Sequence, residues 1–526
     1  MTSMKLLASS ALVVFGVATC FAGAAGPAPT TIAPKALPRV GTIDERFQSY
    51  NIEMVEVTGG RFWKPYASTI TSAPTSANQP TGVDPSLFEY RKPINLYNTR
   101  LRKLATALGP AYVRVSGTWA NSTYFQNTDG PAPETAPAGF KGVLTRQQWK
   151  GVVDFANATG SKIVTSFAIS PGVRDVKGVW TSEQAKQFLD YTTSLGSSIA
   201  AAEFMNEPTI AYMGGAPKDY DAAAFGRDIA VFHAFIKKAA PDMIVLGPGG
   251  LGERQNINPT NQKSIRSEDI LAITGPVFDA FSYHSYGAVS SRCYSATRAS
   301  ATTTADAALT EDWLARSDLS EQYYAGLRDR YEPGKPMWLT ETAQTACGGD
   351  RWASTFLDSF RYLNQLGELA KRGVQVHLHN TLAASDYGLL DEKTYEPRPN
   401  YWSALMWHKL MGTTVLDPGA SPASSLHIYA QCLRNYPGGV ALLVINTDVK
   451  QAQSLNVPTA SERFTLTAHE LTDKQVQLNG VDLKLAADDS LPELKGSEAQ
   501  AGELHFAPTS ITFLAISNAD NKSCQP

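Results

Sequence analysis

Two glutamates follow short apolar runs and could carry acid–base or nucleophilic chemistry. Glu207 comes directly after Glu203–Asn206, and Glu341 comes directly after Met337–Thr340. Each run predicts a buried strand, so each glutamate would lie at the C-terminal edge of a parallel barrel, where active sites are found. Two carboxylates at that edge suit retaining glycoside hydrolysis, in which one protonates the leaving oxygen and the other attacks the sugar.

The neighbours of Glu207 favour a separate role for each glutamate. Asn206 precedes Glu207 and Pro208 follows it. An asparagine amide at that position could bind the sugar 2-hydroxyl, a contact that strengthens as charge develops at the ring. We therefore predict Glu207 as the acid/base and Glu341 as the nucleophile, which requires environments that separate their pKa values. Taken alone, either glutamate could be an ion-paired or surface residue.

Eight apolar segments alternate with helical patterns over residues 49–412. This alternation predicts an α/β fold, a (β/α)8 TIM barrel, with Glu207 at the end of the fourth strand and Glu341 at the end of the seventh. A doubly wound open sheet is the alternative, although no Gly-x-Gly-x-x-Gly follows the first strand. The predicted strands are Ser49–Glu56, Ala111–Ser116, Lys162–Ile169, Ala200–Asn206, Met243–Pro248, Phe278–His284, Pro336–Glu341 and Gly373–Asn380, and the predicted helices are Leu96–Leu108, Thr145–Thr159, Ser182–Leu195, Ala222–Ala240, Ser320–Tyr331 and Trp352–Arg372.

The pattern changes over residues 413–526, where short strand-like runs are separated by Pro, Gly and Asn. Such runs predict a C-terminal antiparallel β-sandwich domain. Residues 39–48 precede the first barrel strand, and we expect them to join this sandwich as an N-terminal strand. Residues 27–38 are rich in Pro, Ala and Thr and predict a linker.

Composition and the N-terminus restrict the class of protein. The chain is 43 % hydrophobic and carries a formal net charge of −3, so it is globular and has no strong basic field for nucleic acid. Residues 1–26 predict a signal peptide, because Lys5 precedes an apolar stretch that ends in small residues. We expect a secreted or periplasmic protein without stable membrane insertion. Thr19 makes Cys20 a poor lipoprotein acceptor. Nothing in the sequence indicates the oligomeric state.

Four cysteines remain after the predicted cleavage, and an exported protein can form disulfides. Position favours the pairs Cys293–Cys347 and Cys432–Cys524, because each pair then lies within one region of the predicted fold. No cysteine has a neighbouring cysteine or histidine at zinc spacing, so we expect no metal and no cofactor. His377 and His379 alternate on the eighth strand and are expected to be hydrogen-bonded inside the barrel.

Several stretches resemble known glycosidases. Asn206-Glu207-Pro208 on strand four, together with a glutamate on strand seven, is similar to clan A glycosidases. The region from Met337 to Leu416 resembles glycoside hydrolase family 79, the heparanases and related β-glucuronidases. The matching stretches are Trp338-Leu339-Thr340-Glu341-Thr342, Ala384-Ser385-Asp386-Tyr387-Gly388-Leu389-Leu390-Asp391, Pro397-Arg398-Pro399-Asn400-Tyr401-Trp402 and Lys409-Leu410-Met411-Gly412-Thr413-Thr414-Val415-Leu416.

The resemblance implies a secreted retaining β-glucuronidase that cleaves β-glucuronides or glucuronate-containing glycans through a covalent glycosyl-enzyme. It also implies that backbone amides of Gly348 and Gly349, with Tyr387, hold the glucuronate carboxylate. Consecutive N–H groups can bind an anion, and glycine permits the close approach. The resemblance further places Thr118, Glu53, His284 and Tyr286 at the sugar or beside the nucleophile.

The sequence alone leaves the activity and the class of protein with alternatives. A different clan A retaining enzyme for neutral sugars, such as a β-xylosidase or β-glucosidase, is the alternative activity, and a non-catalytic glycan-binding protein is the alternative class. Exo and endo action are not distinguished. Basic residues in predicted rim loops could meet sulfate groups; they are Arg91, Lys92, Arg174, Lys177, Arg292 and Arg298.

Overall fold

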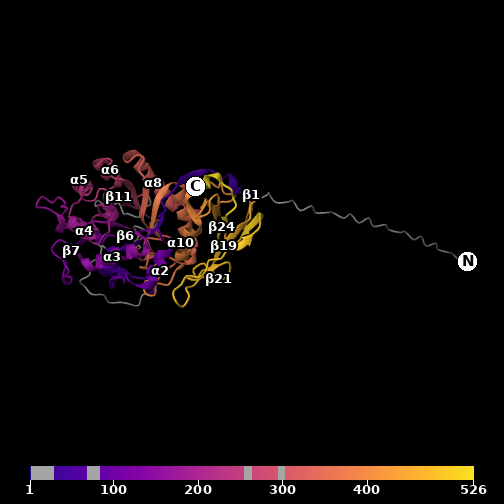
Figure 1. The fold of residues 1–526 in the computed structure, drawn as a ribbon, viewed down its shortest axis with the longest axis horizontal. Helices are drawn as coiled ribbons and strands as arrows, with labels where there is room; N and C mark the ends of the chain where they lie inside the picture. Colours follow the sequence, from indigo (N-terminus) through magenta and orange to yellow (C-terminus); the bar gives the residue numbers. More distant parts are fainter. Residues whose placement is uncertain (2–28, 68–82, 254–263, 294–301, 526) are drawn as a thin grey trace.

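The computed structural model describes residues 1, 29–67, 83–253, 264–293 and 302–525 (Figure 1). The predicted signal peptide, with Cys20, lies outside the described residues, and so does Arg298. None of the helices in these ranges combines the length and apolar character needed to cross a bilayer.

Eight parallel strands close into a barrel in the spatial order β10–β11–β12–β13–β14–β3–β6–β9. This closure confirms the predicted TIM barrel and excludes the open sheet. Most of their residues, polar as well as apolar, are buried, as expected of parallel strands covered by helices. The strands are β3 Gln48–Glu53, β6 Tyr112–Ser116, β9 Lys162–Ser166, β10 Ile199–Glu203, β11 Ile244–Leu251, β12 Ala280–Tyr286, β13 Met337–Ala343 and β14 Val374–His379.

Helices follow the barrel strands and cover them from outside. In α3, Thr145 and Gln148 form a capping box, Gly160 ends the helix with a φ of 66°, and Trp149 and Phe155 lie on the buried face. The helices are α1 Met54–Thr58, α2 Thr99–Ala107, α3 Arg146–Thr159, α4 Glu183–Ser194, α5 Ala222–Ala239, α6 Ser267–Thr274, α7 Glu311–Leu314, α8 Arg316–Tyr331, α9 Phe356–Lys371 and α10 Pro399–Leu410.

Three predicted strands extend too far at their C-terminal ends. The strand predicted over 49–56 ends at Glu53, because Glu53 and Glu56 form a capping box that starts helix α1. The strand predicted over 200–206 ends at Glu203, and the one predicted over 162–169 ends at Ser166. The residues that follow are still buried, for example Phe204 at 2 % exposure. Burial therefore continues into the rim loops after the strand ladder stops.

Two small sheets lie outside the barrel and the sandwich. Strand β4, Gly60–Trp63, pairs antiparallel with β5, Phe88–Arg91. Strand β7, Thr123–Gln126, pairs parallel with β8, Gly142–Thr145. Both sheets are built by loops that leave the C-terminal ends of β3 and β6.

A two-layer β-sandwich completes the molecule and lies beside α9 and α10, at the opposite end of Figure 1 from α4 and α5. The larger sheet has the order β2–β15–β16–β17–β24–β19–β20–β21, with β22 also paired to β19, and the smaller has the order β1–β18–β23. The strands are β1 Thr30–Thr31, β2 Arg39–Thr42, β15 Met411–Leu416, β16 Leu426–Leu433, β17 Val440–Asn446, β18 Gln453–Val457, β19 Ser461–Thr467, β20 Gln477–Leu478, β21 Val481–Asp482, β22 Ser497–Ala499, β23 Gly502–Phe506 and β24 Ser510–Ile516.

The first strand of this sandwich begins at Thr30, before the stretch 39–48 that the sequence predicts as its N-terminal strand. Strand β1 lies within the stretch predicted as a linker and pairs parallel with β18. Strand β2 pairs antiparallel with β15, but it covers only the first four residues of the stretch 39–48. Residues 30–42 and the C-terminal strands therefore lie in one domain.

Two disulfides join segments far apart in the sequence, and both are the predicted pairs. Cys432 in β16 is bonded to Cys524 near the C-terminus, with an S–S distance of 1.99 Å. Cys293, in the loop after β12, is bonded to Cys347, in the loop after β13, with 6.5 Å between the Cα atoms. The second bond therefore ties together two neighbouring rim loops.

Candidate active site

Glu207 and Glu341 meet at the C-terminal mouth of the barrel. A carboxylate oxygen of each lies within 4.8 Å of the other and of a ring nitrogen of His284. Glu341 stands within β13, whereas Glu207 stands beyond the end of β10. Both side chains are nearly buried. Retaining enzymes hold their two carboxyl groups about 5–5.5 Å apart, so the two glutamates are at a separation that allows direct attack on a sugar between them.

The backbone around Glu207 is held in an uncommon conformation. Glu207 has a φ of 47° and a ψ of 66°, in the left-handed region, and Pro208 begins a 3-10 turn directly after it. The Asn121 side chain accepts from the Asn206 N–H at 2.8 Å and donates to the Asn206 carbonyl at 2.9 Å. Such a conformation costs about 1–3 kcal/mol, and it persists only where surrounding contacts fix it. Asn121 supplies those contacts.

Arg114, from β6, connects the residues of both glutamate segments. Its Nη1 donates to Glu341 Oε2 at 3.0 Å. Its Nη2 donates to Asn206 Oδ1 at 2.7 Å and to Glu203 Oε2 at 2.8 Å. The guanidinium is buried, and its charge is balanced by two carboxylates. Arg114 therefore fixes Glu341 and Asn206 relative to each other.

Glu203 is a buried carboxylate beneath the two site glutamates. Ser282 and Thr340 donate to its Oε1 at 2.8 Å and 2.7 Å. Burial alone would raise the pKa of Glu203, but the Arg114 guanidinium and the hydrogen bond with His284 hold it well below its usual range. Glu203 is thus a permanent negative charge that keeps Arg114 and His284 in place.

His284, from β12, lies between the two site glutamates. Its Nδ1 is 3.1 Å from Glu207 Oε1 and 3.7 Å from Glu341 Oε2. Burial would lower the pKa of His284, but the charge of Glu341 and hydrogen bonds to Glu203 and Glu207 raise it to about 10. This raised pKa favours an imidazolium at neutral pH. Nδ1 faces the two site carboxylates, whereas Nε2 lies 3.3 Å from Arg114 Nη2 and 3.7 Å from Glu203 Oε1.

The two glutamates differ in their surroundings. Burial and then the nearby charge of Glu341 raise the pKa of Glu207 above its ordinary value. Glu341 accepts hydrogen bonds from Arg114 and from the Tyr286 hydroxyl, the latter at 2.6 Å. Charged and hydroxyl donors of this kind stabilise an ionised carboxylate. The arrangement suits a proton on Glu207 and a negative charge on Glu341.

The same cluster has the residue types of a cation site. Glu207, His284 and Glu341 have ligand atoms close enough together to hold a metal ion. The raised pKa of His284 and the guanidinium 3.0 Å from Glu341 already place two positive charges there, and a metal needs neutral imidazole. The absence of a metal remains a prediction.

Tyr387 lies in the loop after β14, and the two glycines lie in the loop after β13. Asn380 donates to the hydroxyls of Tyr286, at 3.1 Å, and Tyr387, at 3.2 Å, so Tyr387 is linked through Asn380 and Tyr286 to Glu341. Gly349 has a φ of 87°, and a Cβ on it would lie 3.1 Å from the Tyr387 nitrogen. A Cβ on Gly348 would lie 2.5 Å from Trp63 Cβ. Only glycine is accommodated at these two positions.

Glu53 and Thr118 lie at the ends of the first two barrel strands. Glu53 accepts from the Glu56 N–H as the cap of α1 and is nearly buried. Burial and then the charge of Glu341 raise the pKa of Glu53 well above its ordinary value, so it is protonated beside an ionised neighbour. A Cβ on Gly117 would overlap Glu53 Oε2 at 1.5 Å. Thr118 follows that glycine and is half-buried.

Sequence reasoning missed four residues of this site. Arg114 lies within the predicted strand Ala111–Ser116 and Glu203 within the apolar run before Glu207, and the sequence alone assigns a role to neither. A charged residue inside an apolar strand was the signal that could have identified both. Asn121 and Asn380 carried no signal, because a single asparagine in a loop or at the end of a strand has no distinctive spacing.

Three of the basic residues expected to meet sulfates instead form ion pairs within the protein. Arg91, Arg174 and Arg292 form ion pairs, and their side chains are 13 %, 5 % and 7 % exposed. This corrects the expectation that they face substrate, which rested on loop position alone. Lys92 and Lys177 are exposed. The partners are Glu392 for Arg91, Asp228 for Arg174 and Asp386 for Arg292.

His377 and His379 have the predicted interior role. His377 Nε2 lies 3.0 Å from Gln365 Oε1, and His379 Nε2 lies 2.9 Å from the Tyr387 carbonyl. Burial lowers the pKa of His379 to about 4, so it is neutral and donates from Nε2. His379 thereby fixes the backbone of Tyr387.

The barrel, with paired glutamates at its mouth, is the fold of clan A glycosidases. The model of the family described as "Glycosyl hydrolase family 79, N-terminal domain" matches residues 92–367, more than half of the chain. The chain therefore belongs to this family.

Related proteins agree with this assignment. The chain is 27 % identical to heparanase-like protein 1 of Arabidopsis thaliana over 502 residues, which cover 83 % of this chain and 87 % of the relative. It is 32 % identical to baicalin-β-D-glucuronidase of Scutellaria baicalensis over 188 residues, 34 % of this chain and 36 % of that protein. A 4-O-α-L-rhamnosyl-β-D-glucuronidase structure from Fusarium oxysporum superposes with a TM-score of 0.64 at 13 % identity, covering 93 % of this chain and 100 % of the other. At that identity, the superposition shows the fold alone.

Proposed function

We propose that the protein is an exported retaining β-glucuronidase. The observation that carries the proposal is that Tyr387 is linked through Asn380 and Tyr286 to Glu341, with Gly349 close against Tyr387. A neutral sugar has no acid group that needs two glycine amides and a tyrosine hydroxyl, whereas a uronate does. The family membership and the names of the relatives support the same substrate class.

The proposed reaction proceeds through two displacements. Glu207, protonated because of its raised pKa, donates its proton to the glycosidic oxygen, and the leaving group departs. Glu341 attacks the anomeric carbon and forms a glycosyl-enzyme. Glu207, now a carboxylate, removes a proton from water, which hydrolyses that intermediate and regenerates both groups.

The surrounding residues keep the two carboxyls in different states. Arg114 and Tyr286 stabilise the charge of Glu341 before attack and after release. The buried imidazolium of His284 donates to Glu207 and limits the rise of its pKa, so that Glu207 can also lose its proton during the cycle. These groups are fixed before substrate arrives, which is the condition for electrostatic stabilisation without reorganisation.

Export is part of the proposal. Two disulfides join distant segments of the chain, and such bonds persist in oxidising compartments. The predicted signal peptide over residues 1–26 is consistent with this location.

Hydrolysis of 4-nitrophenyl β-D-glucuronide, measured beside the matching β-glucoside and β-xyloside, tests the proposal. We expect cleavage of the glucuronide with strong preference. Cleavage of a neutral glycoside alone would refute the uronate assignment and favour another clan A activity. If none is cleaved, product sizing on a glucuronate-containing polysaccharide decides between an endo enzyme, which releases oligosaccharides, and a non-catalytic glycan-binding protein, which releases nothing.

A further inference from the structure

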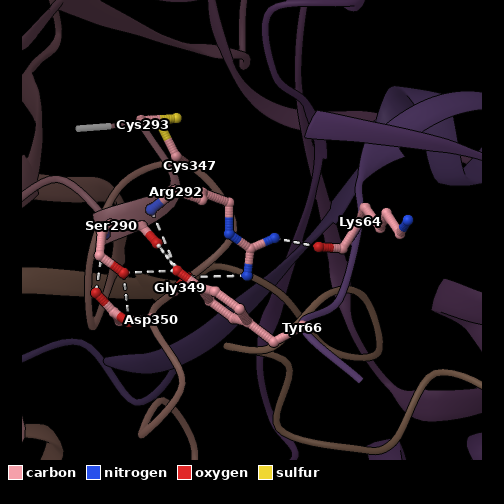
Figure 2. The surroundings of a disulfide bond; sticks show 9 residues. Lys64, Tyr66, Ser290, Arg292, Cys293, Cys347, Gly349 and Asp350 are labelled. Atoms are coloured by element: carbon pink, nitrogen blue, oxygen red, sulfur yellow. Dashed lines mark hydrogen bonds between the residues drawn. A yellow bond between two sulfur atoms is a disulfide. The ribbon is translucent and has the colours of Figure 1, made fainter. Parts of the chain in front are cut away.

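Arg292 lies beside Cys347 and Gly349, which belong to the loop after β13 that also carries Gly348 (Figure 2). Its guanidinium donates through Nη2 to the Gly349 carbonyl at 3.3 Å and to the Asp386 carboxylate. Through Nη1 it donates to the Lys64 carbonyl. One side chain therefore bonds to three separate rim segments. Two of these bear the residues proposed to hold the uronate acid group, namely the loop after β13 and the loop with Tyr387.

Tyr66 supports the same arginine from one side. The guanidinium carbon of Arg292 lies 3.9 Å from the centroid of the Tyr66 ring. The Tyr66 hydroxyl accepts a hydrogen bond from the backbone N–H of Arg292 at 3.2 Å and lies 3.0 Å from Ser290 Oγ. The Tyr66 N–H donates to Asp386 at 3.1 Å. Stacking and hydrogen bonds together leave the guanidinium little freedom to move.

The loops after β12 and β13 are joined along their length. Ser290 N–H donates to the Ala346 carbonyl at 3.1 Å, and the Ser291 N–H donates to Asp350 Oδ2 at 2.9 Å. The Cys293–Cys347 disulfide adds a covalent link, also seen in Figure 2. Cys347 has a φ of 67°, a left-handed conformation that few non-glycine residues adopt. Arg292, one residue before Cys293, lies among these bonds between the two loops.

We infer that Arg292 is a positioning residue that sets uronate selectivity, an inference that rests on the proposed function. By bonding the Gly349 carbonyl and Asp386 at once, it fixes the spacing between the glycine amides and the Tyr387 hydroxyl. Its charge is balanced by Asp386 and its side chain is 7 % exposed, so it acts through geometry and not by contact with substrate. The planar fork of arginine makes these simultaneous bonds, and the point charge of lysine does not.

The Arg292→Lys variant tests this role, because lysine keeps the charge and loses the fork. Two substrates are compared: 4-nitrophenyl β-D-glucuronide and its uronamide, in which a neutral amide of similar size replaces the acid group. We expect kcat/KM for the glucuronide to fall about 10–100-fold, mostly through KM, since misplacement by about 1 Å can cost about 100-fold. We expect kcat/KM for the uronamide to change little, so the acid-to-amide ratio falls.

Arg174→Lys is the matched control. Arg174 is also a nearly buried rim arginine, donating to Asp228 at 2.7 Å and to the Ile169 carbonyl at 2.8 Å, with its guanidinium 5.1 Å from the Tyr220 ring centroid. It lies after β9 and contacts neither glycine in the described structure. We expect the acid-to-amide ratio of this variant to equal that of the wild type.

The outcomes separate this inference from the proposed function. A wild-type enzyme that cleaves acid and amide equally would overturn both. A selective wild type, with equal losses on both substrates in Arg292→Lys, would overturn the inference alone, because that pattern indicates a general structural role. Thermal unfolding checks that the variant is folded. If Arg292→Lys does not fold, Tyr66→Phe replaces it as the test, because this variant removes only the Tyr66 hydroxyl. We then expect the acid-to-amide ratio of Tyr66→Phe to fall severalfold. An unchanged ratio in that variant would also overturn the inference.

Discussion

Replacing His284 with glutamine removes the positive charge between the two site glutamates and keeps a hydrogen-bond donor. His284 Nδ1 lies 3.1 Å from Glu207 Oε1. Burial lowers the pKa of His284, but the charge of Glu341 and hydrogen bonds to Glu203 and Glu207 outweigh burial and raise that pKa to about 10. The ring is therefore an imidazolium at neutral pH. The pKa of Glu207 is raised by burial and by Glu341, and His284 counteracts part of that rise.

The size of the effect follows from the distance. Opposite unit charges 4 Å apart interact by about 4 kcal/mol at an effective dielectric constant of about 20, and about 1.4 kcal/mol corresponds to one pKa unit. That gives about 3 units as an upper value, and opposite charges at such distances shift a carboxyl by about 1–3 units. We expect the pKa of Glu207 to rise by about 1–3 units in the variant. The acid form of Glu207 is the active one, so activity then persists to higher pH.

The assay is the pH dependence of kcat/KM on an aryl β-glucuronide with a poor leaving group, which reports the acid of the free enzyme. His377→Gln is the control, because His377 is also a buried barrel histidine. Burial, followed by the charges of His379 and Arg361, lowers the pKa of His377 well below its ordinary value, so this histidine is neutral. We expect the profile of His377→Gln to match that of the wild type. If the alkaline limb of the His284 variant stays in place or moves to lower pH, the charge coupling described here is wrong.

Three further outcomes are expected. Glu207→Ala should slow β-glucuronides with poor leaving groups far more than activated aryl ones, which need little protonation; equal losses on both would contradict the acid/base assignment. Replacing Cys432 and Cys524 by serine opens a link across 92 residues and should lower the free energy of unfolding in urea by about 2–5 kcal/mol without changing kcat/KM; an unchanged unfolding curve would show that this bond adds no stability. Tyr387→Phe should raise KM for the glucuronide about tenfold through loss of one hydroxyl hydrogen bond of about 1–1.5 kcal/mol, and an unchanged KM would remove Tyr387 from the acid-group contact.

The barrel could be predicted because its strands carry a simple signal. Parallel strands covered by helices are apolar on both faces, and runs such as Met337–Thr340 stand out between helical patterns. The place of Glu341 follows from that rule. The β-sandwich could be predicted for a related reason, since Pro, Gly and Asn interrupt its short strands.

The details of the site could not be predicted, because they depend on contacts between distant segments. Glu207 lies beyond its strand, and Asn121 holds the backbone beside it from another loop. Glu203 and Arg114 form a buried ion pair between β10 and β6, a partnership that no local pattern reveals. Arg292 looked like a surface cation and is instead bonded inside the rim. Charge partners are set by three-dimensional proximity, which single-sequence periodicity does not record.

Trapping the glycosyl-enzyme tests the central claim most directly, namely that the paired glutamates act across one sugar. The protein would be incubated with a 2-deoxy-2-fluoro-β-glucuronyl fluoride, digested and mapped by mass spectrometry. We predict one sugar per chain, attached to Glu341, and no adduct in Glu341→Gln. An adduct on another residue, or steady turnover of glucuronides with no adduct under any condition, would contradict the account.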